Sequence, residues 1–580
     1  MPDIASPGAW YEAVASLADR AEDLADPTAT YVDTVFLPAL QNRRNQVIFG
    51  RRGTGKTHLL RRLRDELYSR FGESRIVPAY VDGATLVGSL SPYRDPAAIA
   101  LSLYVELVRR TVGELSAFIN DELRASVLEL IFSGSKRDRL AQVRQTAGRL
   151  DRLLTQGKVR MLPMGEASAE YENLDEAVSR RRLAAGGNAA VTLSDPRTLG
   201  IKLEASAEKD LRNAARRVST RKVAGQTYLP FAEVNELIRR LLGTLGDASV
   251  AILVDEWSSL GNGDVQPLLA RLLRLTARGG ICVKLACVPG RTKLFLPGVG
   301  RSSPVGLELG DDITADVDLD SVVFVDNDIK QLAGFFMALL QRHIGAVIPR
   351  VRDASPGDFT KYVLSERMLD GRVFAELCHA SSAVPRDFIN VFRQATVMQR
   401  SAGADKMSVA HVRAAARNVY EGKRSNLANT RPDALSLLDR IYRKVVLGQN
   451  SYFFLVEESL VQSPRIIELF TAKLIHRTPA TWLDPLTLAS YIYYMVDYGT
   501  SIELLRTMGA KAWDELTHGT AGLVSVEFFN SSRSPLLDMV LENLVASFDE
   551  ARLDADPAEL IVDREMIEKH LPTSDEGGAR

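Results

Sequence analysis

Residues 46–57 carry the strongest chemical signal in the chain. They include a match to the pattern G-x-x-x-x-G-K-[ST] at every fixed position from Gly50 to Thr57. Glycines let a backbone approach a polyphosphate and turn its N–H groups inward, because no side chain intrudes. We expect Lys56 to reach the terminal phosphates and the Thr57 hydroxyl to be a ligand of Mg²⁺.

The residues on either side of this phosphate loop supply the elements that must position it. A short apolar run at 45–49 predicts a strand, and Leu59, Leu60, Leu63 and Leu67 recur at helical spacing after the loop. The positive end of that helix would also face the phosphates. The residues predicted to bind nucleotide are Gly50, Arg51, Arg52, Gly53, Thr54, Gly55, Lys56, Thr57 and His58.

A pair of carboxylates forms the second chemical signal. The apolar run Val250–Val254 predicts a buried strand that ends in Asp255 and Glu256. Ligands of a doubly wound sheet bind at the carboxyl ends of its strands, so we expect Asp255 to hold Mg²⁺ together with Thr57. Glu256 is then predicted to orient and deprotonate the attacking water. The alternative is a surface turn after a core strand.

The order of elements predicts an α/β fold with a parallel five-stranded sheet. The predicted strands are 45–49, 75–82, 250–255, 280–288 and 317–325, and the predicted helices include 8–25, 99–118 and 267–278. The distance between the second and third strands far exceeds a normal crossover, so an insertion is expected at about 120–230.

The insertion is predicted to be largely helical and is basic. Its best helix is 137–154, and the two apolar runs that flank Asp195-Pro196 predict a hairpin. Residues 134–224 contain 19 Lys and Arg against 11 Asp and Glu, with dense clusters at Arg180-Arg181-Arg182 and at Arg216 to Lys222. Two interpretations remain: a surface that contacts nucleic-acid phosphates, and a solvated helical surface.

Whole-chain composition excludes several classes. The chain has 580 residues, 46% hydrophobic and 25% charged, which predicts several soluble domains. Its formal net charge of −1 gives no global preference for nucleic acid. Three cysteines without a C-x-x-C pair argue against disulfides or a zinc site. No signal peptide or membrane span is visible, so we predict a cytoplasmic protein.

Together these residues resemble an AAA+ P-loop ATPase, closest to the initiator clade of origin-recognition and replication-initiator ATPases and to related signalling ATPases. The resemblance covers about 30–425. It implies a helical lid after the core, and Ser381 to Asn390 resembles the start of the family's sensor-2 helix. Arg386 would then contact the γ-phosphate; the alternative is a surface arginine at a helix start. Ser408 is a plausible N-cap of the last lid helix.

Two features depart from the family pattern. The family's sensor-1 strand ends in a polar residue, whereas here it ends in Ala286-Cys287-Val288, with Thr292 the nearest candidate. No arginine finger can be assigned, although Arg291 and Arg301 are candidates by their order in the chain. Whether a neighbouring subunit activates ATP hydrolysis therefore stays an open question.

The C-terminal part predicts a linker and then a second α+β domain. Residues 422–433 are polar and contain a proline, and 434–508 has the order helix, strand, helix, hairpin. That order resembles a winged helix, whose candidate recognition residues are Arg465, Lys473, His476 and Arg477. Residues 430–510 contain eight basic and eight acidic residues, so contact with DNA and contact with protein are both open.

These patterns define the expected organisation and function. The predicted domains are 1–29 (helical segment), 30–328 (ATPase core with its insertion), 329–425 (lid), 430–510 (winged-helix-like) and 511–580 (helical extension and tail). The predicted activity is a slow ATPase with ATP and Mg²⁺, which repositions the winged helix on double-stranded DNA or a DNA-bound partner. The alternative is a signalling or host-defence scaffold in which ATP controls self-association or partner assembly.

Overall fold

The structure, a computed structural model, divides into two compact units. The described residues are 5–18, 23–24, 26, 28–32, 36–87, 95–124, 134–156, 188–195, 198–204, 229–261, 263–277, 279–297, 304–320, 329–443, 445, 453–483, 490–500 and 502. The core unit comprises Asp33–Phe49 and Lys56–Val317, and the lid unit comprises Met1–Val32, Gly50–Gly55 and Asp318–Arg580. The division therefore passes through the phosphate loop itself.

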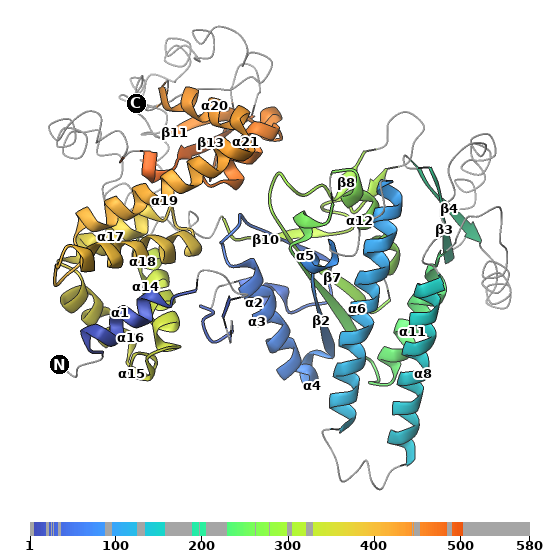
Figure 1. Ribbon diagram of the computed structural model, residues 1–580. Coiled ribbons are helices and arrows are strands. Elements are labelled where there is room, and N and C mark those ends of the chain that lie inside the picture. Colours follow the sequence, from blue (N-terminus) through green and yellow to red (C-terminus); the bar gives the residue numbers. More distant parts are fainter. Residues whose placement is uncertain are drawn as a thin grey trace, which may run out of the picture. The chain divides into compact units, whose positions relative to one another are not determined.

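A five-stranded sheet in the order β10-β1-β7-β6-β2 forms the centre of the core unit (Figure 1). Its strands are β1 (Gln46–Phe49), β2 (Ile76–Asp82), β6 (Ser249–Asp255), β7 (Ile281–Cys287) and β10 (Thr314–Asp318). Strand pairs β1–β7, β7–β6 and β6–β2 are parallel. Every residue of β6 and β7 is buried, which explains why both strands are mostly apolar; their polar residues are Ser249, Asp255 and Lys284.

The α/β prediction is confirmed, with one shifted strand. The fifth strand is β10, which begins three residues before the predicted 317 and ends at Asp318. Backbone pairing beside Asn45 explains the earlier start, because Thr314 N–H donates to the Asn45 carbonyl oxygen at 3.1 Å. Residues 321–328 lie outside the described part of the chain.

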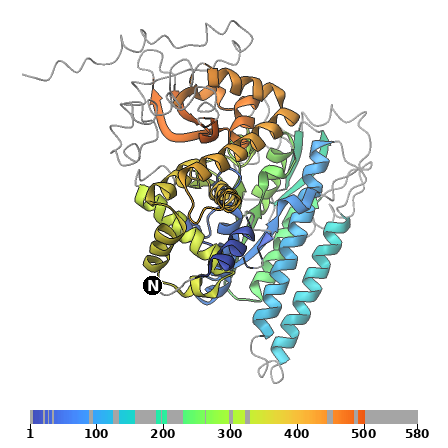
Figure 2. The same cartoon turned by 60° about the vertical axis from the view of Figure 1, so that its left-hand side comes forward.

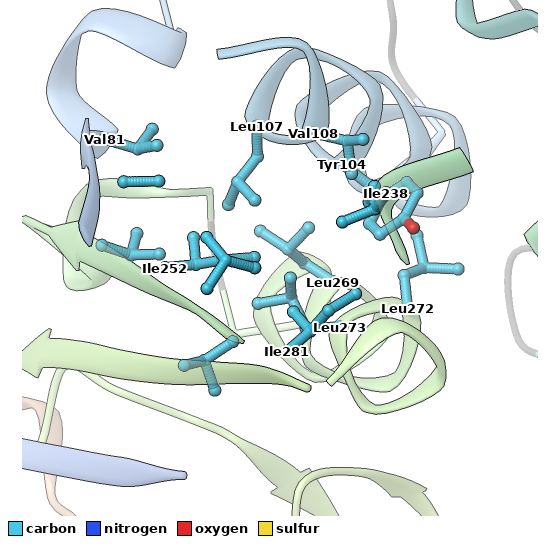
Figure 3. Packing of buried hydrophobic residues seen from close by; sticks show 14 of the residues in the cluster. Val81, Tyr104, Leu107, Val108, Ile238, Ile252, Leu269, Leu272, Leu273 and Ile281 are labelled. Atoms are coloured by element: carbon cyan, nitrogen blue, oxygen red, sulfur yellow. The ribbon is translucent and has the colours of Figure 1, made fainter. Parts of the chain in front are cut away.

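The helices of the core unit pack on this sheet or, like α8, on other helices. They are α2 (Phe36–Leu40), α3 (Lys56–Ser69), α4 (Phe71–Ser74), α5 (Gly83–Val87), α6 (Pro96–Arg124), α8 (Gly134–Gln156), α11 (Phe231–Gly243) and α12 (Val265–Thr276). Figure 3 shows Val81 and Ile252 of the sheet in one apolar cluster with Leu107 of α6 and with Leu269 and Leu273 of α12. This burial holds the carboxyl ends of β2 and β6 in place.

The insertion consists of a long helix and a hairpin in its described part. Helix α8 lies beside α6 (Figure 1 and Figure 2). Strands β3 (Asn188–Asp195) and β4 (Thr198–Glu204) pair antiparallel, as predicted, and β5 (Leu229–Pro230) pairs with β3. The basic clusters at Arg180-Arg181-Arg182 and at 216–222 lie outside the described residues.

Helices dominate the lid unit. They are α1 (Pro7–Ala15), α14 (Ile329–Gly345), α15 (Pro349–Asp353), α16 (Pro356–Tyr362), α17 (Gly371–Ala380), α18 (Pro385–Ser401) and α19 (Val409–Thr430). Helix α1 ends well before the predicted residue 25, at a cap on Ser16. Its Trp10 is buried beside Tyr362 and Phe392, so the N-terminal segment packs inside the lid rather than forming a separate element.

The predicted linker at 422–433 is wrong. Helix α19, with Ser408 at its N-cap, continues unbroken to Thr430, and α20 (Pro432–Ile441) follows after Arg431. Tyr420 and Leu427 are buried on α19, which stabilises its second half despite the polar sequence. Pro432 starts the next helix, because proline is well suited to a first helical turn.

The C-terminal domain, residues 432–502, has the predicted order of elements. After α20 come β11 (Phe453–Glu457), α21 (Pro464–Thr471), β12 (Ile475–Leu483) and β13 (Ser490–Val496), with the antiparallel order β11-β13-β12. The identification as a winged helix stays a prediction. The extension predicted at 511–580 lies outside the described residues.

Helix α21 does not contain all four candidate recognition residues. It ends at Thr471, Lys473 has φ of +59°, and His476 and Arg477 belong to β12. Lys473 N–H donates to the Phe470 carbonyl oxygen and Leu474 N–H to that of Leu469, which is the Schellman pattern of a helix end. The four basic candidates therefore do not share one helix face.

No helix among the described residues combines the length and apolar character needed to cross a membrane.

Candidate functional site

The phosphate loop joins β1 to α3 and contains two glycines in the left-handed region. Gly53 has φ of +90° and Gly55 has φ of +99°, which residues with a side chain rarely adopt. The Thr54 hydroxyl donates to the Arg51 carbonyl oxygen at 2.9 Å and closes the turn. A Cβ atom on Gly55 would meet nothing within 4 Å, so its backbone borders open space. This geometry is compatible with a bound polyphosphate.

Hydroxyl and carboxylate oxygens meet at the carboxyl end of β6. Asp255 is 2% exposed and is hydrogen-bonded to Thr57, and the Tyr80 hydroxyl donates to Asp255 Oδ2 at 2.8 Å. Burial raises the pKa of Asp255, although both hydrogen bonds oppose the shift. Mg²⁺ prefers oxygen ligands, so Thr57 and Asp255 fit the metal that the sequence predicts there.

Lys56 is the first residue of α3 and is only 6% exposed. It lies near Cys287 at the end of β7, where its charge opposes the effect of burial on the thiol. Burial dominates and raises the pKa of Cys287 to about 12, so the thiol stays neutral. Lys56 therefore places a positive charge beside the end of β7.

Glu256 adopts a strained backbone conformation. Its φ of +48° and ψ of +39° lie in the left-handed region, and the Ser259 hydroxyl donates to Glu256 Oε2 at 3.2 Å. Gly83 packs against the same turn: a Cβ atom there would lie 2.6 Å from the Asp255 carbonyl oxygen. Backbone strain of this kind persists where the surroundings enforce it, and it often occurs at functional sites.

Thr292, which follows β7, contacts Ser258 in the turn after β6. Ser258 Oγ lies 2.8 Å from the Thr292 hydroxyl and accepts from Val288 N–H at 2.7 Å. Thr292 is thus tied to the turn that follows Glu256, and Cys287 occupies the strand end where the resemblance predicts a polar residue. Of the arginine-finger candidates, Arg291 is described and Arg301 is not.

Within the lid unit, the start of α18 packs directly on Gly53. Arg386 N–H donates to the Gly53 carbonyl oxygen at 3.2 Å. A Cβ atom on Gly53 would lie 2.7 Å from Arg386 Cβ, so only glycine permits this approach. The structure therefore brings the predicted sensor-2 residue to the phosphate loop.

The side chain of Arg51, one of the residues predicted to bind nucleotide, is buried and paired with Asp320. It is 1% exposed, its Nε donates to Asp320 Oδ1 at 2.7 Å, and its N–H donates to Asp320 Oδ2 at 2.8 Å. Its guanidinium also contacts His476 Nδ1 and lies over the Phe470 ring, 5.3 Å from the centroid. Arg52 is exposed, and His58 is half-buried on α3.

Burial of His476 makes the stability of the lid unit depend on pH. Burial lowers the pKa of His476 from 6.5 to about 4; Arg51 and Lys423 add to the shift, and Asp497 opposes it. Between these values the unfolded chain binds a proton that the folded chain does not. The free energy of unfolding therefore falls as pH decreases through this window.

We expect His476→Gln to remove up to about 3 kcal/mol of this pH dependence. Urea unfolding of both proteins at about pH 7 and about pH 4.5 measures the difference. His379, whose pKa burial also lowers to about 4, remains in both and leaves a residual slope. An unchanged pH dependence in the variant would contradict a buried, neutral His476.

Sequence reasoning missed Tyr80, Gly83 and Asp320. Tyr80 and Gly83 lie at the end of β2, whose Asp82 is in register with Asp255. The end of the second predicted strand could have indicated them, because parallel strands bring their carboxyl ends together. Nothing in the residues around Asp320 identifies its partner, 269 residues away.

Comparison with known proteins supports the resemblance over one segment. Residues 17–73, which contain β1, the phosphate loop and α3, match the model of the ORC-CDC6-like family. A search of curated proteins found no match. A solved structure of Drosophila ORC bound to DNA is 10% identical, with 86% of this chain and 90% of that chain covered and a TM-score of 0.24. The match at 17–73 confirms the resemblance to initiator-type AAA+ proteins for the segment that carries the phosphate loop.

Proposed function

We propose that this protein binds and slowly hydrolyses ATP as an AAA+ switch, and that nucleotide state repositions the C-terminal domain on DNA or on a DNA-bound partner. The hydrogen bond between Thr57 and Asp255 carries the proposal, because it joins the phosphate loop's helix to the acidic strand end. P-loop NTPases hold Mg²⁺ with a hydroxyl and a carboxylate at this place.

Different groups of the loop would bind different parts of the nucleotide. Backbone N–H groups from Gly53 to Thr57 would bind the phosphate oxygens, with help from the positive end of α3. The Lys56 ammonium would bind the terminal phosphates as a point charge. Mg²⁺, held by Thr57 and Asp255, would supply charge neutralisation at those phosphates.

Hydrolysis requires a base and a sensor. Glu256 would accept the proton of the attacking water, and the hydrogen bond from Ser259 to Oε2 orients its carboxylate. Arg386 would contact the γ-phosphate and report its loss to α18. The contact of Arg386 N–H with Gly53 supports this assignment, because it holds the start of α18 at the loop.

A signalling or host-defence scaffold is the second candidate, and the C-terminal domain favours it. Lys473 pairs with Asp387, and His476 is buried against Arg51 and Asp497, so neither is available to read DNA bases. In this function ATP binding would control assembly, with little direct DNA contact. Arg465 on α21 stays the candidate closest to a recognition role.

Turnover measured with and without duplex DNA tests the proposal. We expect ATP hydrolysis that depends on Mg²⁺ and responds to DNA, with the response weakening as salt increases. Light scattering on the same samples separates the two candidates. ATP-dependent assembly without any DNA effect would favour the scaffold, and absence of ATP binding would reject both.

The basic insertion gives a separate prediction for DNA. Replacing Arg180, Arg181 and Arg182 by Ala should weaken duplex binding and reduce the slope of log affinity against log salt by about 2.7, for three lost phosphate contacts. Electrophoretic shift across a salt series measures that slope. The matched control replaces three exposed lid arginines, Arg350, Arg352 and Arg372. An unchanged slope in the insertion variant would assign that cluster to a solvated surface.

A further inference from the structure

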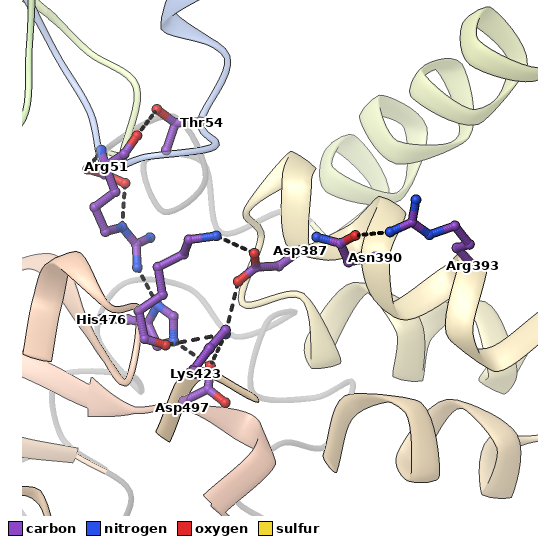
Figure 4. A network of polar contacts seen from close by, with 10 residues as sticks. Arg51, Thr54, Asp387, Asn390, Arg393, Lys423, His476 and Asp497 are labelled. Atoms are coloured by element: carbon purple, nitrogen blue, oxygen red, sulfur yellow. Dashed lines mark hydrogen bonds and ion pairs between the residues drawn. The ribbon is translucent and has the colours of Figure 1, made fainter. Parts of the chain in front are cut away.

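Seven buried or nearly buried polar side chains form one network in the lid unit (Figure 4). They come from the phosphate loop, from the segment after β10, from α18 and α19, and from the C-terminal domain. The members are Arg51, Asp320, Asp387, Lys423, Lys473, His476 and Asp497. The proposed binding and hydrolysis of ATP use none of these side chains.

One end of the network is the phosphate loop. Asp320 binds both the backbone N–H and the Nε of Arg51, so loop backbone and side chain are held together. The guanidinium then donates to His476 Nδ1, since an arginine has only donors. Any movement of Arg51 must therefore displace His476 of β12 or break the hydrogen bond between the two side chains.

The other end is the first turn of α18. Asp387 follows Arg386 directly and is 3% exposed. Its carboxylate pairs with Lys473 of the C-terminal domain and, at 2.9 Å, with Lys423 of α19. The sensor-2 helix and the C-terminal domain are thus joined next to the residue proposed to sense phosphate.

The segment 473–476 joins the two ends. His476 Nε2 donates to Asp497 Oδ2 at 3.1 Å, and Lys423 pairs with the same oxygen at 2.9 Å. With His476 neutral, three cations face three carboxylates, so the buried charges balance. Separating Arg51 from Asp320, or Lys473 from Asp387, would leave a desolvated charge without its partner, which is strongly unfavourable.

Lys473 keeps its contact with Asp387 although its own backbone conformation is unfavourable. It occupies the left-handed position at the end of α21, where glycine is the usual residue. Lysine is strained there, and its ammonium is the group that reaches Asp387. Strained residues persist where their surroundings over-determine them, often at switch regions.

We propose that the C-terminal domain reads the nucleotide state directly, through this network, because one short segment holds both the phosphate loop at Arg51 and the sensor-2 helix at Asp387. The inference rests on the proposed function, since it requires ATP to bind at the loop. Coupling of this kind is reciprocal: a partner that shifts the C-terminal domain changes ATP affinity by the same factor.

Hydrogen exchange of the full-length protein tests the proposal. Backbone amides of 474–477 are followed with and without saturating ATP, and ATP binding is measured on the same samples. We expect ATP to change their exchange rate about tenfold in the wild type, within the usual range of coupling between sites. Arg51→Met and Lys473→Gly should each reduce the change to about twofold or less.

The two variants differ in their risk of misfolding. Arg51→Met leaves Asp320 without its arginine, whereas Lys473→Gly relieves backbone strain and leaves Asp387 paired with Lys423. The matched control is Arg413→Met. Arg413 pairs with Glu376 of α17, and the Glu376 carboxylate also accepts a hydrogen bond from the Tyr498 hydroxyl. These contacts join the lid helices to the C-terminal domain without involving the phosphate loop. The control should respond to ATP as the wild type does.

Four outcomes overturn the proposal. ATP that binds the wild type without changing exchange at 474–477 rejects the coupling and leaves the proposed function standing. A wild-type response in Lys473→Gly rejects the role of this network. If Arg413→Met also loses the ATP response, then the losses in the other variants reflect a general loosening of the contact between the lid and the C-terminal domain. A wild type that binds no ATP rejects the proposed function and the coupling with it.

Discussion

Lys56→Ala should lose ATP binding almost entirely, with an affinity reduced about 100-fold or more. The reason is the placement of charge around the loop. Lys56 is buried at the start of α3, and the guanidinium of Arg51 is already engaged with Asp320 and His476. Removing Lys56 takes away the ammonium that we propose to bind the terminal phosphates, so only the loop backbone would remain to bind their charge.

Titration with a fluorescent ATP analogue measures this loss. Arg64→Ala is the matched control, because it removes one positive charge from the same helix, where Arg64 is exposed and paired with Asp65. The control should keep its affinity within about threefold, as expected for an exposed ion pair. If Lys56→Ala binds ATP as well as the wild type does, the assignment of the phosphate loop is wrong.

Glu256→Gln should bind ATP normally and hydrolyse it about 10²–10⁴ times more slowly. The amide keeps the shape of the side chain, and its oxygen still accepts a hydrogen bond from Ser259, so the turn after β6 is preserved. What it loses is the capacity to take a proton from water. Single-turnover hydrolysis, measured beside ATP affinity, separates the two effects.

Asp255→Asn is the informative comparison. Asp255 shares its hydrogen bonds with Thr57 and Tyr80, so its substitution should weaken Mg²⁺-dependent nucleotide binding as well as turnover. Substitution of Asp255 would then affect both binding and hydrolysis, whereas substitution of Glu256 would affect hydrolysis alone. Hydrolysis at the wild-type rate by Glu256→Gln would remove Glu256 as the base, and equal effects of both substitutions on binding would reject the division of roles.

The sequence alone predicted the elements whose information lies in contiguous residues. The strand, loop and helix at 45–69 and the strand that ends at Asp255 appear in the structure where they were predicted. In each, a run of apolar residues lies directly beside the functional motif in the sequence. The hairpin around Asp195-Pro196 follows the same logic, since alternation and turn residues are local signals.

Local reasoning failed where burial overrides composition. The polar stretch 422–433 is mostly helix, because Tyr420 and Leu427 anchor α19 in the protein interior. The run 464–477 has a helical pattern, yet it divides at Lys473 between a helix and a strand. A sequence window contains the helix propensity but not the partner, Asp387, that holds Lys473 in a left-handed conformation.

Only the tertiary structure decided what surrounds the predicted site. The sequence by itself determined that Gly50–Thr57 matches a phosphate-loop pattern and that a buried strand ends at Asp255, directly before Glu256. It did not determine that Tyr80 bonds Asp255 across 175 residues, or that Arg51 bonds Asp320 across 269. Such pairs exist because a buried charge needs a partner, and folding selects that partner from any part of the chain.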